Sequence, residues 1–132
     1  MSDPKIAAVH RLYAAYGRGD VEAVLAEVSD DVEWGAEAAS RSVPWYGEHR
    51  GKDDVARFFK EIAANVDVTE FTPLSFTAND TDVVAVVKWA YTVHATGKRA
   101  AMHMQHWWRF ADGKIVKFLG SEDTDQSAAA FS

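Results

Sequence analysis

Two titratable side chains, His106 and Asp123, stand in a C-terminal stretch of this 132-residue chain, residues 100–124, that is rich in apolar and aromatic residues. An imidazole titrates near neutral pH, and a carboxyl group among apolar neighbours has its pKa raised towards neutrality by burial. Groups of this kind are the usual acids and bases of enzymatic proton transfer. Whether these two can act together depends on whether the chain brings them to the same side of one surface.

Two predicted hairpins position these residues. Asp112-Gly113 stands between two alternating apolar runs, which is a strong signal for a two-residue turn. Gly97-Lys98 has the Gly-first pattern of a type II′ turn. The stretch therefore predicts a meander of three long antiparallel strands.

Two-residue loops fix how these strands pair. They set Trp89 opposite His106 in the first hairpin, and Met102 opposite Asp123 in the second. Because side chains alternate between the two faces of a sheet, His106 and Asp123 then share one face. That face also carries a set of apolar and aromatic residues, namely Trp89, Tyr91, Val93, Met102, Met104, Trp108, Phe110, Ile115 and Leu119.

This face has the composition of a pocket wall, since a plain core would usually be built from Leu, Ile and Val. The chain holds five tryptophans, more than packing between helices and a sheet readily absorbs. A small, flat or aromatic ligand is the expected occupant of a cavity lined by such rings. The candidate ligand-contacting residues are Trp34, Trp45, Trp89, Tyr91, Met104, Trp108 and, near the rim, Tyr13. The alternative is that these residues form an ordinary core.

Lys117 argues against this pairing, because it would place an ammonium group on the apolar face, opposite Trp108. If the Asp112-Gly113 turn is a three-residue loop with a bulge, the alternation shifts by one residue. Glu122 would then face inward in place of Asp123. Asp123 would in that case be an exposed carboxylate near a strand end.

No metal site or cofactor is expected. His103 and His106 fall on opposite faces of one strand, and no HxH or HxxxH spacing brings two ligands together. His94 and His103 are expected at solvent or an interface, and His49 lies in an aromatic loop. The absence of cysteine excludes disulfides, thiol catalysis and thiolate metal sites.

The other elements follow from capping residues and hydrophobic spacing. Helices are predicted over 3–18, after Asp20 and over 52–66, a short strand around Trp34, and a further strand over 69–78. Pro73 predicts that this last strand is an edge strand or carries a bulge. Residues 36–51 are interpreted as an aromatic loop, and the end of the chain after Thr124 is expected to fray. Helices followed by strands indicate the α+β class.

Composition excludes several partners. The net charge of −6 and the lack of a long basic run argue against nucleic acid and anionic membranes. No apolar run approaches the ~20 residues of a membrane span, and the first residues lack the pattern of a signal peptide. We therefore expect a single cytoplasmic domain over residues 1–132.

Four segments in the right order resemble the SnoaL-like proteins of the nuclear transport factor 2-like superfamily, which also contains ketosteroid isomerases. They are GRGD with VEAVLAEVSDDVEW, PWYGEHRGKDDVARFF, HWWRFADGKIVKF and the late EDT. The resemblance implies a cone-shaped, curved antiparallel sheet, with three helices from the N-terminal half closing a pocket. It also implies a homodimer through the outer face of the sheet, where Trp107, His103 and Gln105 are expected.

The resemblance to SnoaL-like polyketide cyclases also suggests roles. It implies that Asp123 is the general acid/base of an aldol cyclisation, isomerisation or dehydration, and that His106 is its partner or the donor to a developing oxyanion. The ketosteroid isomerase pattern is not matched, because its base aligns with Ala36 and its oxyanion tyrosine with Leu12. Two alternatives stay open: a binding protein without catalysis, and a dimerisation or scaffold domain whose cavity is filled by its own side chains.

Overall fold

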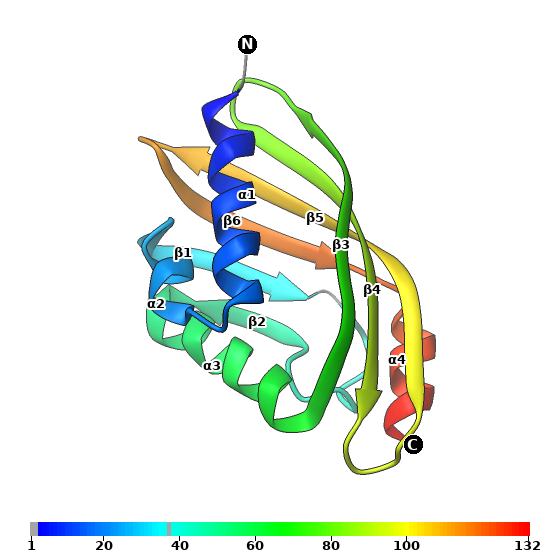
Figure 1. Ribbon diagram of the computed structural model, residues 1–132. Helices are drawn as coiled ribbons and strands as arrows, with labels where there is room; N and C mark the ends of the chain where they lie inside the picture. Colours follow the sequence, from blue (N-terminus) through cyan, green and yellow to red (C-terminus); the bar gives the residue numbers. More distant parts are fainter. Residues whose placement is uncertain (1–2, 37) are drawn as a thin grey trace.

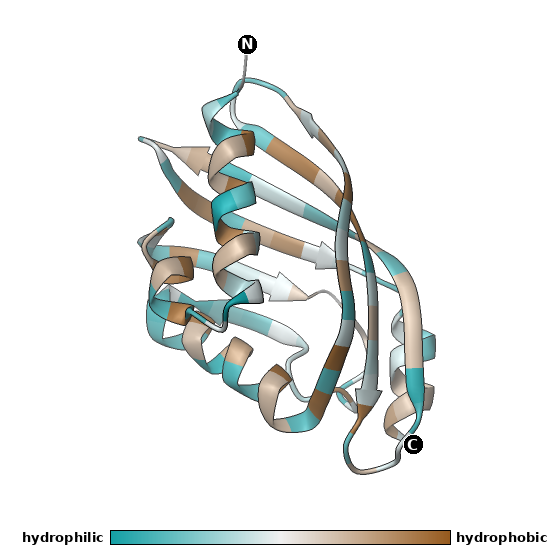
Figure 2. Ribbon diagram, in the orientation of Figure 1, coloured by the Kyte–Doolittle hydropathy of each residue, from teal (hydrophilic) through white to brown (hydrophobic). Residues whose placement is uncertain are grey.

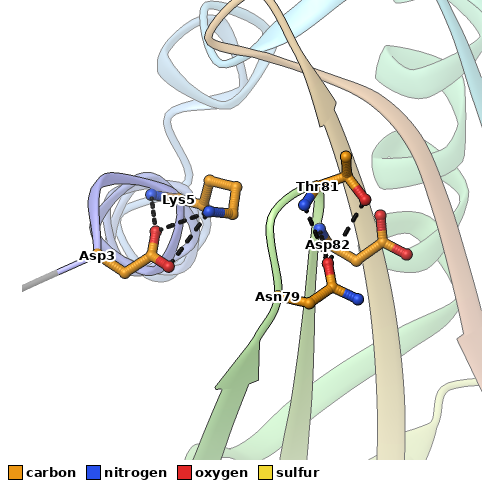
Figure 3. A network of polar contacts seen from close by, with 5 residues as sticks. All are labelled: Asp3, Lys5, Asn79, Thr81 and Asp82. Atoms are coloured by element: carbon orange, nitrogen blue, oxygen red, sulfur yellow. Dashed lines mark hydrogen bonds and ion pairs between the residues drawn. The ribbon is translucent and has the colours of Figure 1, made fainter.

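The computed structural model describes residues 3–36 and 38–132. Helix α1 spans Pro4–Gly17, and the Asp3 carboxylate caps it by accepting a hydrogen bond from the Lys5 backbone N–H at 2.8 Å (Figure 3). Helix α2 spans Val21–Leu25, with the Asp20 side chain as its cap. Helix α3 spans Gly51–Asn65. All three predicted helices are therefore confirmed.

Six strands form one curved sheet in the order β2-β1-β6-β5-β4-β3, and Figure 1 shows it bending around α1 and α3. The strands are β1 (Val28–Ala36), β2 (Gly47–Arg50), β3 (Val66–Ala78), β4 (Asp82–Val93), β5 (Arg99–Ala111) and β6 (Lys114–Ser121). The α+β class and the curved sheet are confirmed, and the sheet is not closed into a barrel. The sheet is antiparallel except between β1 and β6, which run parallel.

Strand β3 lies at one edge of the sheet, as Pro73 predicts. Its register with β4 shifts between Pro73 and Ser75, so this strand both forms an edge and carries an irregularity. The turn into β4 is closed by Asn79, whose side-chain oxygen accepts from the backbone N–H groups of Thr81 (2.9 Å) and Asp82 (2.8 Å) (Figure 3).

Two regions differ from the sequence-based expectation. The segment expected to be a loop contains β2, which pairs with β1 through Trp34 and His49. The chain end expected to fray forms helix α4, Thr124–Phe131, which packs against β4 and β5 (Figure 1). In the described part of the chain, no helix is both long and apolar enough to cross a membrane.

The turn between β4 and β5 is longer than predicted. The Val93 N–H donates to the Lys98 carbonyl at 2.9 Å and thereby encloses a loop of four residues, and Arg99 lies opposite Thr92. The predicted pairing was therefore displaced by four residues. Because four is an even number, every side chain keeps its predicted face. The displacement sets His106 opposite Ala85, so the predicted pairing of His106 with Trp89 is wrong.

The turn between β5 and β6 has the predicted two residues, Asp112 (φ 51°) and Gly113 (φ 78°). The error lies further along the strand. Phe110 pairs with Ile115, but Arg109 pairs with Lys117, which leaves Val116 as the extra residue of a bulge. Beyond this bulge, every side chain of β6 lies on the face opposite to the predicted one.

The reversed faces remove the problem posed by Lys117. Phe118 now lies opposite Trp108 on the inner face and is buried, whereas Leu119 turns outward. The Lys117 ammonium lies outside, 4.8 Å from the centre of the Trp107 ring. The bulge thus keeps a charge out of the core.

The core occupies the space between the concave face of the sheet and the helices. In Figure 2 hydrophobic and hydrophilic residues mix along α3, which buries one stripe only, formed by Val55, Phe58 and Ile62. Across from it, the inner face of β4 and β5 is buried along its length. This space holds the candidate site.

Candidate functional site

A cavity of about 60 Å³ lies inside the core, between α1, α3 and the inner face of the sheet. Its wall is almost wholly apolar and aromatic, and the exceptions are the imidazole of His106 and the carboxyl group of Glu122. The other lining residues are Leu12, Tyr13, Tyr16, Trp34, Ala36, Trp45, Phe58, Phe59, Ile62, Phe71, Trp89, Met104, Trp108, Phe118 and Gly120. An engineered apolar cavity of roughly 150 Å³ accepts benzene, so this cavity must widen to accept a ring of that size.

A larger groove of about 890 Å³ adjoins the cavity, between α1, α3 and β3. The two spaces share Tyr13, Tyr16, Phe59, Ile62 and Phe71 as wall. The Tyr16 ring lies 5.4 Å from that of Phe59 and 5.2 Å from that of Phe71, between their centres. These three partly buried rings are the partition between the groove and the inner cavity.

His106 stands at one end of the cavity and is 7% exposed. Its Nδ1 lies 2.7 Å from the Tyr13 hydroxyl oxygen, and that same oxygen accepts a hydrogen bond from Trp108 Nε1 at 3.2 Å. Burial lowers the pKa of His106 to about 3, so the imidazole is neutral at physiological pH. Burial likewise raises the pKa of Tyr13, which keeps its proton.

Glu122 marks a second polar end, just beyond the last residue of β6. Its Oε2 accepts hydrogen bonds from the Tyr46 hydroxyl (2.8 Å) and the Ser127 hydroxyl (2.6 Å). Burial raises the pKa of this carboxyl group, while the two hydroxyl donors lower it. A carboxyl group with a raised pKa beside an apolar cavity has the properties of a general acid/base.

The two ends lie on the same side of the sheet. His106 pairs with Gly120, and Glu122 follows two residues later, so about 7 Å of strand separates their positions. The Phe118 ring packs over Gly120, where an added Cβ would lie only 3.1 Å from it. A ligand in the cavity can therefore meet an imidazole and a carboxyl group together.

Asp123 does not lie on this surface, and its predicted place on the pocket face is wrong. Its carboxylate is exposed and caps α4, accepting from the Gln126 backbone N–H at 3.1 Å. The physical reason is the bulge at Val116, which turns Glu122 inward instead. The alternative expectation, in which Glu122 faces the cavity, is therefore correct. The bulge responsible lies within β6 and not in the turn where it was expected.

The aromatic candidates separate into two groups. The residues that line the cavity are Tyr13, Trp34, Trp45, Trp89, Met104 and Trp108. Tyr91 does not line it, which corrects the prediction: it is fully buried behind the wall, with its ring centre 4.6 Å from that of Trp89 and 5.8 Å from that of Trp45. Its hydroxyl has no hydrogen-bond partner among the described residues.

Several residues that line the cavity or contact its lining were not singled out from the sequence. Tyr46 and Ser127 reach Glu122 from 76 and 5 residues away, and no local pattern links such positions. Phe59 and Phe71 belong to apolar stripes that signal burial without indicating a cavity. Tyr16 lies one helical turn after Tyr13, and this spacing places both on one face of α1.

Trp34 carries a further polar feature. Its ring is buried, 4.4 Å from the Phe118 ring between centres, and its Nε1 has no acceptor among the described residues. A buried donor without an acceptor costs about 1–3 kcal/mol. Because this atom is fully enclosed, its unpaired N–H lowers the stability of the fold.

The remaining histidines lie outside the cavity. His103 is exposed on the outer face of β5. His94 bridges the Asp67 carboxylate (3.0 Å) and the Ala64 carbonyl (3.1 Å), and both contacts raise its pKa. His49 Nε2 lies 3.2 Å from the Trp45 carbonyl, so it holds the loop before β2.

The SnoaL-like domain family matches residues 9–118 of the chain. Among solved structures, an NTF2-like protein of unknown function from Burkholderia pseudomallei is similar, with 23% identity, 99% of both chains covered and a TM-score of 0.91. An NTF2-like protein from Burkholderia thailandensis is 30% identical over 100% of this chain and 99% of its own, with a TM-score of 0.88. TerC, crystallised with polyporic acid, is 22% identical over 98% of both chains, with a TM-score of 0.87. No curated protein matches the sequence.

Proposed function

Because the chain belongs to the SnoaL-like domain family of NTF2-like proteins, we propose that it binds a small, hydrophobic, ring-containing molecule in the inner cavity and transfers a proton on it. The observation that carries this proposal is the composition of the wall. Two titratable groups, His106 and Glu122, stand in an otherwise apolar and aromatic lining. Such a site is suited to proton abstraction from carbon next to a carbonyl group.

In this reaction, the Glu122 carboxylate takes the proton from the carbon beside the carbonyl. The electrons of the broken C–H bond form an enolate, and its oxygen accepts a hydrogen bond from the neutral imidazole of His106. Glu122 then returns the proton to a different carbon, which is an isomerisation. When the enolate carbon first attacks a second carbonyl in the same molecule, the proton goes to the new alkoxide, which is an aldol cyclisation.

The raised pKa of Glu122 supports its role, because a carboxylate with a higher pKa is a stronger base. The carboxylate remains accessible through Oε1, since both hydroxyl donors bind Oε2. Tyr46 and Ser127 then hold the carboxyl group in a fixed orientation. Asp123, exposed at the start of α4, has no part in this scheme.

The size of the ligand follows from the two adjoining spaces. A ring enters from the groove and occupies the cavity when Tyr16, Phe59 and Phe71 rotate aside. Their partial exposure favours such movement, because a side chain facing the groove has space to move into. The similar protein TerC was crystallised with polyporic acid, which supports a hydrophobic ligand in this fold.

Titration calorimetry and product analysis with a panel of cyclic ketones, quinones and aromatic polyketides test the proposal. The Glu122→Gln variant is expected to bind a ligand with wild-type affinity but to lose conversion by 100-fold or more, on the order of a general base's contribution. Asp123→Asn is the matched control, and it should convert at the wild-type rate. Equal conversion by wild type and Glu122→Gln would refute the role of Glu122.

A carrier without catalysis is the second candidate. The observation that favours it is that Glu122 accepts hydrogen bonds from two hydroxyl groups. A buried carboxyl group with a purely structural role needs such hydrogen bonds as well. A carrier is expected to bind one member of the panel saturably in wild type and Glu122→Gln alike, without any product.

We also propose that a second copy of the chain covers the outer face of the sheet. Trp107 is half-buried there between the Arg109 guanidinium (5.2 Å from the ring centre) and the Lys117 ammonium (4.8 Å), and Val84 is 42% exposed. Aromatic and Arg residues are enriched at interfaces. Sedimentation analysis should give a dimer that Val84→Glu dissociates, whereas Ala64→Glu on α3 should leave it intact. A monomeric wild type would exclude this interface.

A further inference from the structure

We propose that Trp108 and Tyr13 are positioning residues that hold His106 in the tautomer with its proton on Nε2. The cavity then presents a neutral N–H donor, which selects an occupant carrying an acceptor oxygen, such as a ketone or quinone carbonyl. This inference deepens the proposed function. Its first test nevertheless needs no ligand, so the two can fail separately.

The direction of the hydrogen bonds follows from the chemistry of the three groups. An indole N–H can only donate, so the Tyr13 oxygen must accept the bond from Trp108 Nε1 at 3.2 Å. The Tyr13 hydroxyl has one hydrogen of its own, and His106 Nδ1 lies 2.7 Å away. Nδ1 therefore accepts this hydrogen through its lone pair, and in a neutral imidazole the proton stands on Nε2.

The opposite tautomer leaves a hydroxyl hydrogen unpaired. If Nδ1 carried the proton, the Tyr13 oxygen would accept from both Trp108 and His106, and its own hydrogen would have no acceptor. No other described residue accepts a hydrogen bond from Tyr13. Tyr13 is buried in α1, where an unpaired hydroxyl hydrogen is unfavourable.

The surroundings of His106 keep it neutral as well. Rings from four elements pack against it: Tyr13 of α1, Phe71 of β3, Trp108 of β5 and Phe118 of β6. None of them carries a charge that would stabilise an imidazolium. The carboxyl group that shares the cavity is that of Glu122, and it makes no hydrogen bond to the imidazole. Burial raises the pKa of both tyrosines in the wall, Tyr13 and Tyr16, so they stay uncharged.

The ligand class follows from the donor that remains. His106 Nε2 makes no hydrogen bond to a described residue, and His106 lines the apolar cavity. An acceptor oxygen on a flat ring satisfies this N–H donor, whereas a hydrocarbon ring of similar size leaves it unpaired.

The first test is a long-range ¹H–¹⁵N NMR spectrum of the histidine rings in the free protein, recorded between pH 8 and pH 5. We expect a lone-pair type of nitrogen shift for Nδ1 of His106 and a protonated type for Nε2, unchanged over this range. In Tyr13→Phe the hydroxyl that donates to Nδ1 is removed, and the two nitrogen shifts of His106 should move towards each other as the tautomers mix. Tyr16→Phe, on the same helix and cavity, should keep the wild-type shifts.

An Nδ1 proton in the wild type, or identical His106 shifts in wild type and Tyr13→Phe, would overturn the inference. A backbone ¹H–¹⁵N spectrum of each variant shows that it is folded. His103, exposed on the same strand, serves as an internal reference and should show the same shifts in every variant.

The second test compares 1,4-naphthoquinone with naphthalene by calorimetry, because the two differ in their acceptor oxygens at similar size. We expect roughly tenfold tighter binding of the quinone, and loss of that preference in His106→Leu. Equal affinity of wild type for both compounds would refute the selection of an acceptor. Binding of neither compound would refute the entry of a two-ring ligand into the cavity, while the NMR result would still decide the tautomer.

Discussion

Lowering the pH from 7 to 5 should destabilise this protein through His106 in particular. The folded chain holds the imidazole in an apolar site that lowers its pKa to about 3, against 6.5 in its ordinary state. Between these two values the unfolded chain binds a proton on His106 and the folded chain does not. Stability therefore falls as the pH drops below 6.5 and is restored as the pH rises.

The magnitude follows from the two pKa values. Each pH unit below 6.5 removes about 1.4 kcal/mol, so at pH 5 the loss from this residue is about 2 kcal/mol. For a chain of this length, 2 kcal/mol corresponds to a change in Tm of roughly 6 °C. His106 is 7% exposed, so solvent screening reduces this figure little.

The assay is urea unfolding of wild type, His106→Asn and His103→Asn at pH 7 and pH 5. Asn can still accept a hydrogen bond from Tyr13 but does not titrate. The free energy difference between wild type and His106→Asn should shift by about 2 kcal/mol in favour of the variant at pH 5. The exposed His103→Asn control should follow the wild type. A difference that stays the same at both pH values would show that His106 binds protons equally in both states, and the described burial would be wrong.

Three further predictions concern single groups. Glu122→Gln should gain stability relative to wild type as the pH rises above 4.5, because burial raises the pKa of Glu122 and its ionisation then opposes folding. Thermal unfolding from pH 4 to pH 8 measures the difference in stability between the two proteins, and a constant difference would contradict the prediction. Asp123→Ala should destabilise the protein by about 1 kcal/mol through loss of the α4 cap and leave ligand binding unchanged, so weaker binding would contradict the exposed position of Asp123. The His94 pKa, followed by NMR, should lie above 6.5 in wild type and fall in Asp67→Asn. The contact between His94 and Asp67 stabilises the fold below pH 6.5, and its contribution is lost as the pH rises through the pKa of His94 in the folded chain. An unchanged pKa in the variant would rule the contact out.

The positions of the helices, the strand-rich second half of the chain and the inward or outward side of each residue in β4 and β5 can be predicted from the sequence. The caps Asp3 and Asp20 were predicted because capping depends on neighbours a few residues away. Helix α4 had a similar local signal, Asp123 followed three residues later by Gln126, which resembles a capping box. The sequence therefore contains a local signal for α4.

The polar contacts of the site cannot be predicted in this way, because they join residues far apart in the chain. Tyr13 meets His106 across 93 residues, and Tyr46 meets Glu122 across 76. Hydrophobic spacing indicates that a tyrosine on α1 faces inward, but it does not say which side chain its hydroxyl will reach. The sequence therefore predicts the wall of the cavity better than it predicts the polar groups in it.

The two register errors show why a small error can matter more than a large one. The β4–β5 pairing was displaced by four residues, yet His106 stayed on the inner face because four is even. The bulge at Val116 is one residue, and it exchanged Asp123 for Glu122 as the carboxyl group at the cavity. The driving force was available in the sequence, since a Lys on an apolar face is unfavourable. When the alternation of a strand would place a charged side chain in the core, a one-residue bulge costs less free energy than burying that charge. The residues predicted to face the site beyond that position should then be shifted by one.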